Sequence, residues 1–363
     1  MKVSLQSFYS SFYGDDFARY FVRVPYKSNT KIHKQFPVQN TKQLWLNMDK
    51  VNGIYPTYAS VYDYGSIDDL KRNNTQNIVL DRVFFDFDVT DSTTNTIKKR
   101  LVELRTKNLK YNINEQRELV NEMRELLIHD KVAEPAYNDC CKFSKILENE
   151  FSKPALFFSG GKGCHAYPFF DQVKLSEPNK TIKHFSEVIK NAFNFKTMDL
   201  SVNKDPISRK SRIPYSKHHL TGLSVVPFET SDTYEEVIEK AIKPVVEQFC
   251  FEKHLTTLGS HLKEIDNILV KNSKIEAKAK DTNNPRVYSC YSSVGEDNRP
   301  YFKKILGEPA KTYEHYDMYN CPFPDHEDTN PSFQVHQFGY KCYGCGRMGN
   351  YRQIMKYLNR TDI

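Results

Sequence analysis

The sequence lacks the features that mark membrane and exported proteins. No apolar run in its 363 residues approaches the roughly 20 residues that a membrane-spanning helix needs. The N-terminal residues 1–17 contain no continuous apolar stretch of the kind found in secretory signals. Eight cysteines in a chain of this length do not make a disulfide scaffold, and without an export signal we expect them to stay reduced. The expected class is therefore a soluble intracellular protein with no membrane partner.

Tryptophan is nearly absent, with one residue, whereas tyrosine and phenylalanine number 23 and 24. A hydrophobic fraction of 39% allows a sizeable core, in one large domain with appendages or in two domains. Lysine and arginine exceed the acidic residues by 52 to 45, and the net charge of +7 is compatible with a polyanionic partner. The GxxxxGK[ST] phosphate loop is also missing, which excludes a P-loop motor activity in this chain.

Hydrophobic patterning predicts an α/β protein with a large first domain. Strand patterns occur near 80–90, 155–170 and 223–228, and leucines at helical spacing indicate a helical insertion at about 95–150. A polar stretch with few large apolar residues then precedes a segment marked by cysteine and proline. The expected organisation is a first domain at 1–270, a linker at 271–285 and a second domain at 286–363.

Two aspartates alternate with aromatic residues in the strand pattern VFFDFDV at 83–89. A strand has a period of two, so Asp86 and Asp88 project from one face, one pleat apart. Two such carboxylates repel each other beside a hydrophobic strand, and Mg²⁺ or Mn²⁺ would relieve that repulsion. An ordinary strand with one solvated polar face remains the alternative at this point.

The segment SGGKGCH at 159–165 places three glycines next to polar side chains directly after a strand pattern. Glycines let a backbone approach phosphate oxygens, and Ser159, Lys162 and His165 could add donors. A simple hairpin turn would also explain the glycines.

A basic cluster at 198–223 combines several cations with two acids, Asp199 and Asp205. Arg209 and Arg212 lie three residues apart and could converge on one triphosphate, since planar guanidinium groups bind phosphate bidentately. A solvated basic loop is the alternative for this segment alone.

Taken in order, the DxD strand, SGGKGxH and an acid followed by RxxR-x-P-x-S-x-H-x-x-TGL resemble the archaeo-eukaryotic primase superfamily over roughly residues 80–228. The pattern looks like the small catalytic primase subunit and the related primase-polymerases. That resemblance implies a mixed or antiparallel catalytic sheet flanked by helices. It also implies two divalent ions, Mg²⁺ or Mn²⁺, held by Asp86, Asp88 and a third acid, for which Asp199 fits best and Asp205 is the fallback. The implied nucleotide-binding residues are Ser159, Lys162, His165, Arg209, Arg212, Ser216 and His218.

The chain departs from that family at two cations. Lys162 stands where members often have arginine, and Leu220 precedes Thr221-Gly222-Leu223 where a lysine is customary. The first change replaces a planar fork by a point charge, and the second removes a charge. Both bear on the affinity for triphosphate.

Paired cysteines mark the C-terminal segment, in which C-x4-H is followed after fifteen residues by C-x2-C. This spacing supplies four N/S ligands for one tetrahedral Zn²⁺, and a hairpin around Gly339 would bring the two pairs together. A closed four-ligand site is structural, and scattered reduced cysteines are the alternative. The expected zinc ligands are Cys321, His326, Cys342 and Cys345.

This segment resembles the zinc ribbon of bacterial-type primases, through CPF…H…PSF…C-x-GCG. The resemblance implies contact with a single-stranded template, for which aromatic and basic side chains provide stacking faces and phosphate partners. A folding staple with no nucleic-acid role is the alternative. The side chains of the right kind are Tyr340, Lys341, Tyr343 and Arg347.

Together these resemblances imply a DNA-directed primase or primase-polymerase that makes a primer on single-stranded DNA from NTPs, dNTPs or both. The competing hypotheses are a gap-filling polymerase that only extends primers, and a non-catalytic single-strand or origin-binding zinc protein. Implied partners are template DNA, nucleotides, and a primase large subunit or a helicase. The expected location is the cytoplasm, or the nucleoid or nucleus at sites of replication.

Overall fold

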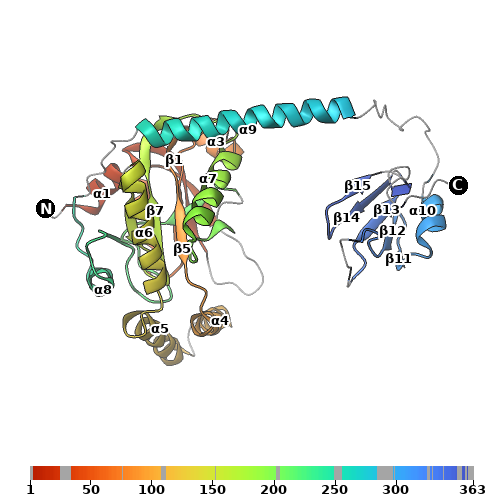
Figure 1. The fold of residues 1–363 in the computed structure, drawn as a ribbon. Coiled ribbons are helices and arrows are strands. Elements are labelled where there is room, and N and C mark those ends of the chain that lie inside the picture. The colour runs from red at the N-terminus through yellow and green to blue at the C-terminus, as the bar shows by residue number, and fades with distance from the viewer. Residues whose placement is uncertain are drawn as a thin grey trace. The chain divides into compact units, whose positions relative to one another are not determined.

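The computed structural model describes most of the chain (Figure 1), and all structural statements below concern the described residues. It divides into two compact units, Met1–Ala277 and Lys278–Ile363. None of the described helices combines the length and apolarity needed to cross a membrane. The described residues are 3–24, 34–75, 77–107, 112–151, 153–201, 205–248, 256–283, 297, 299–324, 328, 330–337, 339–349, 354–355 and 358.

The first unit contains two four-stranded sheets and one two-stranded sheet, and every pairing between their strands is antiparallel. The sheet of order β2-β1-β3-β9 consists of β2 (Lys34–Asn40), β1 (Asp16–Arg23), β3 (Thr57–Ser60) and β9 (Lys210–Arg212). The sheet of order β10-β6-β7-β5 consists of β10 (Val226–Phe228), β6 (Ala155–Phe158), β7 (Gly163–Tyr167) and β5 (Phe85–Asp88). The short pair is β4 (Leu80–Arg82) with β8 (Phe169–Val173).

Helices flank these sheets, which confirms the expected α/β class with antiparallel sheets. The helices of this unit are α1 (Leu5–Tyr13), α2 (Thr41–Asp49), α3 (Ile67–Arg72), α4 (Ser92–Lys107), α5 (Ile113–Ile128), α6 (Glu134–Glu150), α7 (Pro178–Phe193), α8 (Tyr234–Ile242) and α9 (Thr256–Asn283). Helices α4, α5 and α6 occupy the stretch where leucine spacing predicts helices.

Helix α6 covers the apolar face of the sheet that carries the two aspartates. Phe143 of α6 lies 4.6 Å from Phe85 and 5.4 Å from Phe87, measured between ring centroids. Both β5 phenylalanines are buried, while Asp86 and Asp88 alternate with them. Burial of large aromatic rings is strongly favourable, so the period of β5 fixes which face packs and which face stays polar.

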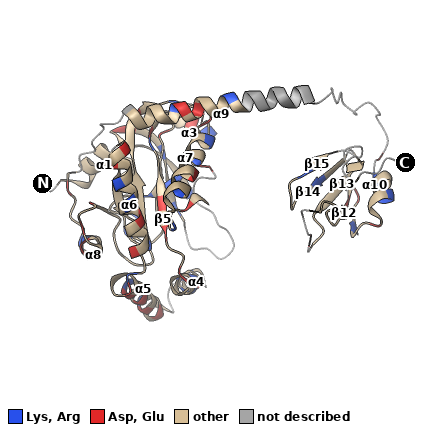
Figure 2. Ribbon diagram, in the orientation of Figure 1, with Lys and Arg blue, Asp and Glu red and all other residues tan. Residues whose placement is uncertain are grey.

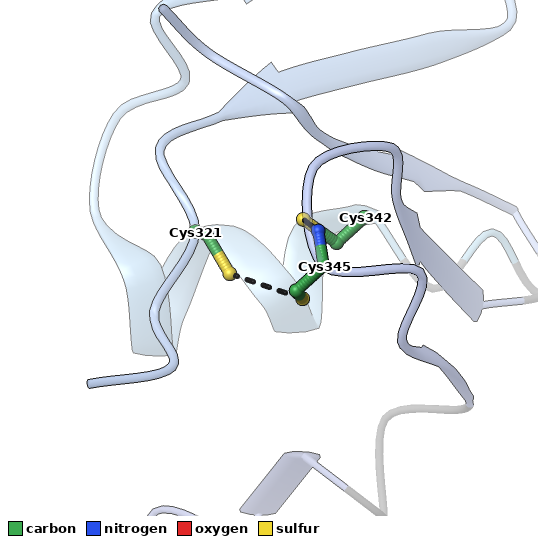
Figure 3. Close-up of side chains that lie close together, drawn as sticks. All are labelled: Cys321, Cys342 and Cys345. Carbon is green, nitrogen blue, oxygen red and sulfur yellow. Dashed lines mark hydrogen bonds between the residues drawn. The ribbon is translucent and has the colours of Figure 1, made fainter. Parts of the chain in front are cut away.

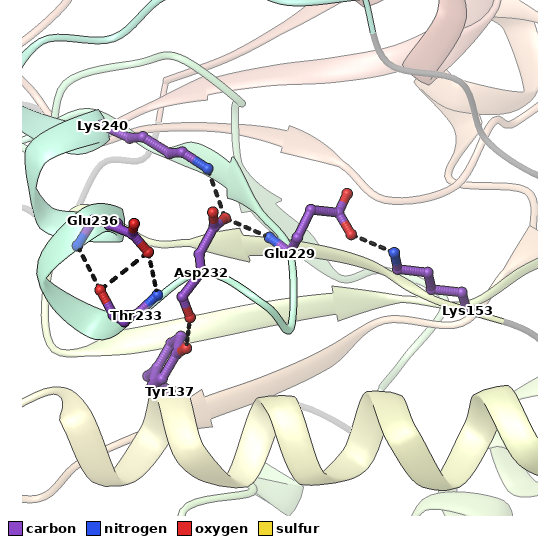
Figure 4. A network of polar contacts seen from close by, with 7 residues as sticks. All are labelled: Tyr137, Lys153, Glu229, Asp232, Thr233, Glu236 and Lys240. Carbon is purple, nitrogen blue, oxygen red and sulfur yellow. Dashed lines mark hydrogen bonds and ion pairs between the residues drawn. The ribbon is translucent and has the colours of Figure 1, made fainter.

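A polar network attaches the segment after β10 to α6 (Figure 4). The carboxylate of Asp232 accepts from the Glu229 amide at 2.8 Å and from Lys240 at 2.6 Å, and Tyr137 of α6 donates to the Asp232 carbonyl. Thr233 and Glu236 form a capping box that starts α8. These contacts hold the outer edge strand β10 against the core.

The boundary between the two units, after Ala277, falls inside the expected linker at 271–285, and helix α9 runs through the described part of that stretch to Asn283. The stretch is polar but contains lysine, glutamate and alanine, which are good helix formers, and no glycine or proline before Pro285. Proline disfavours helix at the residue before it, which agrees with an end near this point. Residues 284–285 lie outside the described part of the chain.

Asp266 attaches α9 to the first unit. Its side chain, 4% exposed, accepts from the amides of Ser176 and Glu177 at 2.8 Å each and from the Thr181 hydroxyl at 3.0 Å. These donors belong to the start of α7, where helix N–H groups have no intrahelical partner.

We expect Asp266→Ala to destabilise the first unit by roughly 2 kcal/mol, because the Ser176 and Glu177 amides and the buried Thr181 hydroxyl lose a charged acceptor. Chemical denaturation monitored by circular dichroism measures this. Asp49→Ala, at the C-terminal end of α2, is the control. An unchanged midpoint for Asp266→Ala would show that the cap contributes nothing.

The second unit is a five-stranded antiparallel sheet of order β11-β12-β13-β14-β15 with helix α10 (Arg299–Leu306). Phe302 and Ile305 of α10 belong to the same buried cluster as Phe333 and Tyr340, so the helix covers one face of the sheet. The strands are β11 (Lys311–Thr312), β12 (Tyr316–Tyr319), β13 (Phe333–His336), β14 (Gly339–Cys342) and β15 (Met348–Gly349). Strands β13 and β14 form the expected hairpin, with Gly339 at the start of β14.

Candidate active site

A cleft of about 1270 Å³ in the first unit is lined by residues from both four-stranded sheets and from α4. All three predicted carboxylates line it, as do most of the predicted nucleotide-binding residues. Figure 2 marks acidic residues on β5. The predicted site residues on the cleft wall are Asp86, Asp88, Asp199, Asp205, Ser159, Lys162, His165, Arg209, Arg212 and His218.

Backbone pairing places Asp199 beside the β5 aspartates. Phe87 and Met198 form an antiparallel bridge, flanked by the bonds Asp199 N–H to Asp86 C=O and Asp88 N–H to Thr197 C=O, both 2.8 Å. Residues opposite each other in such a pair share a face of the sheet. Asp86, Asp88 and Asp199 therefore project into the cleft from one surface, although over a hundred residues separate Asp88 from Asp199.

Asp86 is a partly buried carboxylate with charged groups of both signs close to it. Its side chain is 18% exposed and lies 3.6 Å from His165 Nε2 and 3.4 Å from an Arg209 nitrogen. Desolvation, together with the charges of Asp88 and Asp199, raises the pKa of Asp86 to about 7, while Arg209 opposes the rise.

Asp88 is affected in the same direction. Desolvation raises its pKa, and the Asp199 charge adds to this, against the attraction of Lys162 and Lys98. Carboxylates that repel one another in a partly dehydrated cleft fit a divalent cation, which prefers oxygen ligands.

The carboxylate oxygens of Asp86, Asp88 and Asp199 do not lie close enough together to share one metal ion in this structure. Within the described residues, the cysteine cluster treated below is the group whose three ligand atoms all lie within 4.8 Å of one another. The Asp86 carboxylate turns toward His165 and Arg209, and that of Asp199 accepts from the Ser201 amide and hydroxyl at 2.8 Å each.

Asp199 rather than Asp205 is favoured as the third carboxylate. Both line the cleft, but Asp199 is joined to β5 by its backbone and its charge acts on both β5 aspartates. The charge of Asp205 instead acts on Lys210.

The glycines at 159–165 make room for neighbouring chain segments. A β-carbon on Gly163 would lie 2.4 Å from the Phe87 carbonyl oxygen, and one on Gly161 would lie 2.9 Å from His218 Nε2. Gly160 has φ +73°, and its β-carbon would lie 2.7 Å from the Leu223 carbonyl oxygen. The segment is a turn between β6 and β7, and it presents Ser159 and Lys162 to the cleft.

The imidazole of His218 lies beside this turn, and in its neutral form it can donate one hydrogen bond from Nε2. Its Nδ1 accepts from the Leu220 amide at 3.3 Å, so the proton of the neutral ring sits on Nε2, beside Gly161. Burial, with the charge of Arg212 and others, lowers the pKa of His218 well below its usual value. Burial and Arg212 likewise lower the pKa of His165 to about 3 and that of His219 to about 2.

Buried neutral histidines predict a specific acid sensitivity. The unfolded chain takes up a proton on His219 below its ordinary pKa of 6.5, but the folded protein does not until about 2. Titration of this histidine therefore leaves the folding free energy unchanged above pH 6.5, and below that pH it destabilises the folded protein by about 1.4 kcal/mol per pH unit for each such histidine.

We expect His219→Gln to flatten the fall in melting temperature between pH 6.5 and 5, as calorimetry would measure. His184→Gln, at an exposed side chain of α7, is the matched control. Identical slopes for His219→Gln and the unmodified chain would refute the assignment.

The two arginines reach the cleft from the strand β9 side. Arg212 lies on β9 opposite Tyr58 of β3, with its guanidinium 5.1 Å from the tyrosine ring centroid. Arg209 immediately precedes β9 and contacts Asp86. One cation therefore sits beside the carboxylates, and the other lies farther along the wall, next to an aromatic face.

Ser216 is the predicted nucleotide-binding residue that the structure does not bring to the cleft. Its side chain is 1% exposed, and its hydroxyl donates to the Ile213 carbonyl at 2.7 Å. The hydroxyl stabilises the turn that follows β9, and a nucleotide contact of Ser216 stays a prediction without support from the cleft geometry.

Several cleft residues went unrecognised in the sequence. Tyr58 and Gln35 come from the N-terminal sheet, Lys98 comes from α4, and His219 follows His218. Its position directly after His218, a predicted nucleotide-binding residue, could have marked His219 as a cleft residue. No local pattern marks Tyr58 or Gln35, because pairing of β3 with β9 alone brings that sheet to the site.

A candidate metal centre lies in the second unit, where three cysteines gather (Figure 3). The sulfurs of Cys321 and Cys345 are 3.9 Å apart, and two thiolates on one tetrahedral Zn²⁺ would be about 3.8 Å apart. Burial opposes ionisation, but the hydrogen bond from the Cys345 amide, at 3.5 Å, and the polar contact with the Ser332 hydroxyl lower the pKa of Cys342 to about 7. The three thiols fit Zn²⁺. The fourth expected ligand, His326, lies outside the described residues.

Asp328 organises the loop around these thiols. Its carboxylate accepts from the Cys321 amide at 2.7 Å and from the Ser332 hydroxyl at 2.7 Å. Ser332 in turn lies 3.2 Å from the Cys342 sulfur. Hydrogen bonds of this outer kind orient metal ligands.

The template-contact residues expected in this unit divide between its core and its surface. Tyr340 is 6% exposed and stacks on Phe333, and Arg347 lies 4.6 Å from the Phe323 ring centroid, so neither offers a free stacking face. Tyr343 is 62% exposed, with Lys341 4.9 Å from its ring centroid.

No protein-family model and no curated protein sequence matches the chain. Among solved structures, the archaeo-eukaryotic primase domain of the cyanophage S-2L primase-polymerase aligns with 13% identity and a TM-score of 0.34, covering 64% of this chain and 94% of that one. The polymerase domain of Mycobacterium tuberculosis ligase D, in complex with DNA, aligns with 11% identity and a TM-score of 0.34, covering 66% and 86%. Alignments this loose transfer no activity to this chain.

Proposed function

We propose that this chain is a template-directed nucleotidyltransferase that synthesises primers on single-stranded DNA. The observation that carries the proposal is the pairing of residues 197–199 with β5, because it puts Asp199 on the same face as Asp86 and Asp88. Three carboxylates on one wall and several cationic or neutral donors on the others suit phosphoryl transfer, which depends on positioning and electrostatics. The order of the motifs along the chain supports the same class.

In this proposal Asp86, Asp88 and Asp199 hold two Mg²⁺ or Mn²⁺ ions. Such ions activate a 3′-hydroxyl and neutralise the charge of the triphosphate and the leaving pyrophosphate. Arg209 limits the repulsion at Asp86 and keeps its carboxylate oriented before substrate enters.

The walls that adjoin the carboxylates bind the incoming nucleotide. His218 offers its Nε2 proton beside Gly161, and Lys162 and Ser159 lie on the adjacent turn. Because burial keeps His165 and His218 neutral, they donate hydrogen bonds without adding charge. Arg212 supplies the bidentate cation of these walls.

The second unit is assigned to template binding, with one structural Zn²⁺ held by Cys321, Cys342, Cys345 and His326. Its sheet supports this, because cross-strand pairs align side chains of neighbouring strands in one row, and the exposed Tyr343 contacts Gln334 and Lys341 of that row. Aromatic and basic side chains on a sheet bind single strands by stacking and phosphate contact. The row consists of Lys311, Met318, Gln334, Lys341 and Met348.

An assay on unprimed single-stranded DNA tests the function. The full chain is incubated with Mg²⁺ or Mn²⁺ and with NTPs or dNTPs in separate reactions, and labelled products are resolved by size. New primers support the proposal. Extension of a supplied primer without synthesis on unprimed template would instead indicate a gap-filling polymerase, and binding without any incorporation would indicate a non-catalytic single-strand-binding protein.

A further inference from the structure

One face of helix α4 forms part of the cleft wall. Thr94, Lys98, Val102 and Thr106 all line the cleft, and they follow one another at every fourth position. Residues four apart lie one above another on a helix, so this stripe runs along the cleft for most of the helix. Lys98 is its one cation, it is exposed, and it makes no ion pair with any described residue.

The N-terminal half of α4 is fixed against the glycine turn. The Asp91 carboxylate accepts from the Thr94 amide at 2.6 Å and starts the helix. Asn95 accepts from Lys162 of the turn at 3.2 Å. One turn further, the backbone of Lys98 lies about 4.5 Å along the helix axis from Asn95.

The C-terminal half is fixed against the loop that contains His218. Leu220 of that loop is 4% exposed and belongs to a buried cluster with Ile97 and Leu101 of α4 and Met123 of α5. Arg105 donates to the His219 carbonyl at 2.8 Å. Lys98 therefore lies between two anchored points, one at the glycine turn and one at the 218–222 loop.

The charge of Lys98 acts on groups from both sides of the cleft. It opposes the rise in the pKa of Asp88, and it contributes to the lowered pKa values of His218 and His219. Lys98 lines the cleft, and its charge acts on Asp88 as well as on His218 and His219, so its ammonium group lies near the space between them.

We propose that Lys98 binds the β- and γ-phosphates of the incoming nucleotide and the pyrophosphate that leaves. This inference rests on the proposed function, and it assigns a role to the helical segment between the first two motifs. The loop position that could have carried a cation is Leu220, whose apolar side chain instead docks α4. Docking the helix through Leu220 brings a different cation, Lys98, to the same cleft.

Pyrophosphate binding in the presence of Mg²⁺ tests the role directly, by calorimetry on the full chain. We expect Lys98→Ala to weaken pyrophosphate binding and to raise the KM for nucleotide, each about tenfold, since it removes one charge-assisted hydrogen bond. Affinity for single-stranded DNA should change less than about twofold. Lys98→Arg should restore most of the binding, because it returns the positive charge.

Lys99→Ala is the matched control, because Lys99 is the next residue, is exposed, and does not line the cleft. Equal losses in the two variants, or a loss of DNA affinity without a loss of pyrophosphate affinity, would overturn the inference. So would a wild-type chain that binds no pyrophosphate. If nucleotides are incorporated and Lys98→Ala matches the wild type, the inference alone fails. If pyrophosphate binding depends on Lys98 but nothing is incorporated, the proposed function alone fails.

Discussion

Replacing Asp88 by asparagine is expected to reduce nucleotide incorporation by at least about a thousandfold while leaving the fold intact. The loss follows from the removal of a charge that would hold a divalent cation, which contributes several kcal/mol to transition-state stabilisation. Asp88 is exposed at the end of β5, and its charge repels that of Asp199. Its neutralisation should therefore change the melting temperature little.

This combination of a large loss of activity with a small change in stability separates a catalytic role from a structural one. Asp171→Asn, at an exposed carboxylate of β8 that does not line the cleft, is the control and should retain full activity. Incorporation rates and calorimetric melting are measured on the same preparations. Substantial residual activity in Asp88→Asn at saturating Mn²⁺ would contradict the proposed metal site.

Loss of zinc is expected to unfold the second unit and leave the first unit folded. The buried cluster of the second unit is small, and Cys342 is a member of it. A structural zinc in such a module contributes on the order of 10 kcal/mol, so the thiols and the core depend on each other. One zinc per chain should be present by elemental analysis.

Cys345→Ser tests this assignment, because it removes one thiol that is only partly buried. We expect zinc to be lost and amide hydrogen exchange to become fast throughout residues 299–349, while exchange in the first unit stays unchanged. Cys141→Ser, on α6 of the first unit, should retain the metal. Retained protection in a zinc-free Cys345→Ser chain would show that the metal is not structural.

Short-range patterns predicted a substantial part of the site. The alternation in 83–89 placed Asp86 and Asp88 on one face, and the structure has the buried phenylalanines and polar aspartates of β5 that this alternation requires. The glycine-rich segment was expected between two strands and lies between β6 and β7. The cysteine spacing predicted the convergence of Cys321, Cys342 and Cys345.

Composition and membership of a motif gave less information about local conformation and burial. Polar composition at 271–285 predicts a linker, and the boundary between the units lies there, but composition did not reveal that helix α9 continues to Asn283. Ser216 belonged to a basic motif, but its hydroxyl satisfies a backbone carbonyl in a turn. Tyr340 looked like a stacking platform because it is aromatic, whereas its position on β14 directs it into the core.

The sequence by itself determined the residue types of the site, the face of each strand and the spacing of the metal ligands, because these depend on periods of two to four residues. Only the tertiary structure decided that Asp199 joins β5, that Tyr58 and Gln35 come to the cleft, and that Lys98 faces it. Such placements depend on strand register and helix docking between segments far apart in the chain. Backbone pairing of Phe87 with Met198 and of β3 with β9, together with packing of Leu220 on α4, fixes them, and no local pattern encodes those contacts.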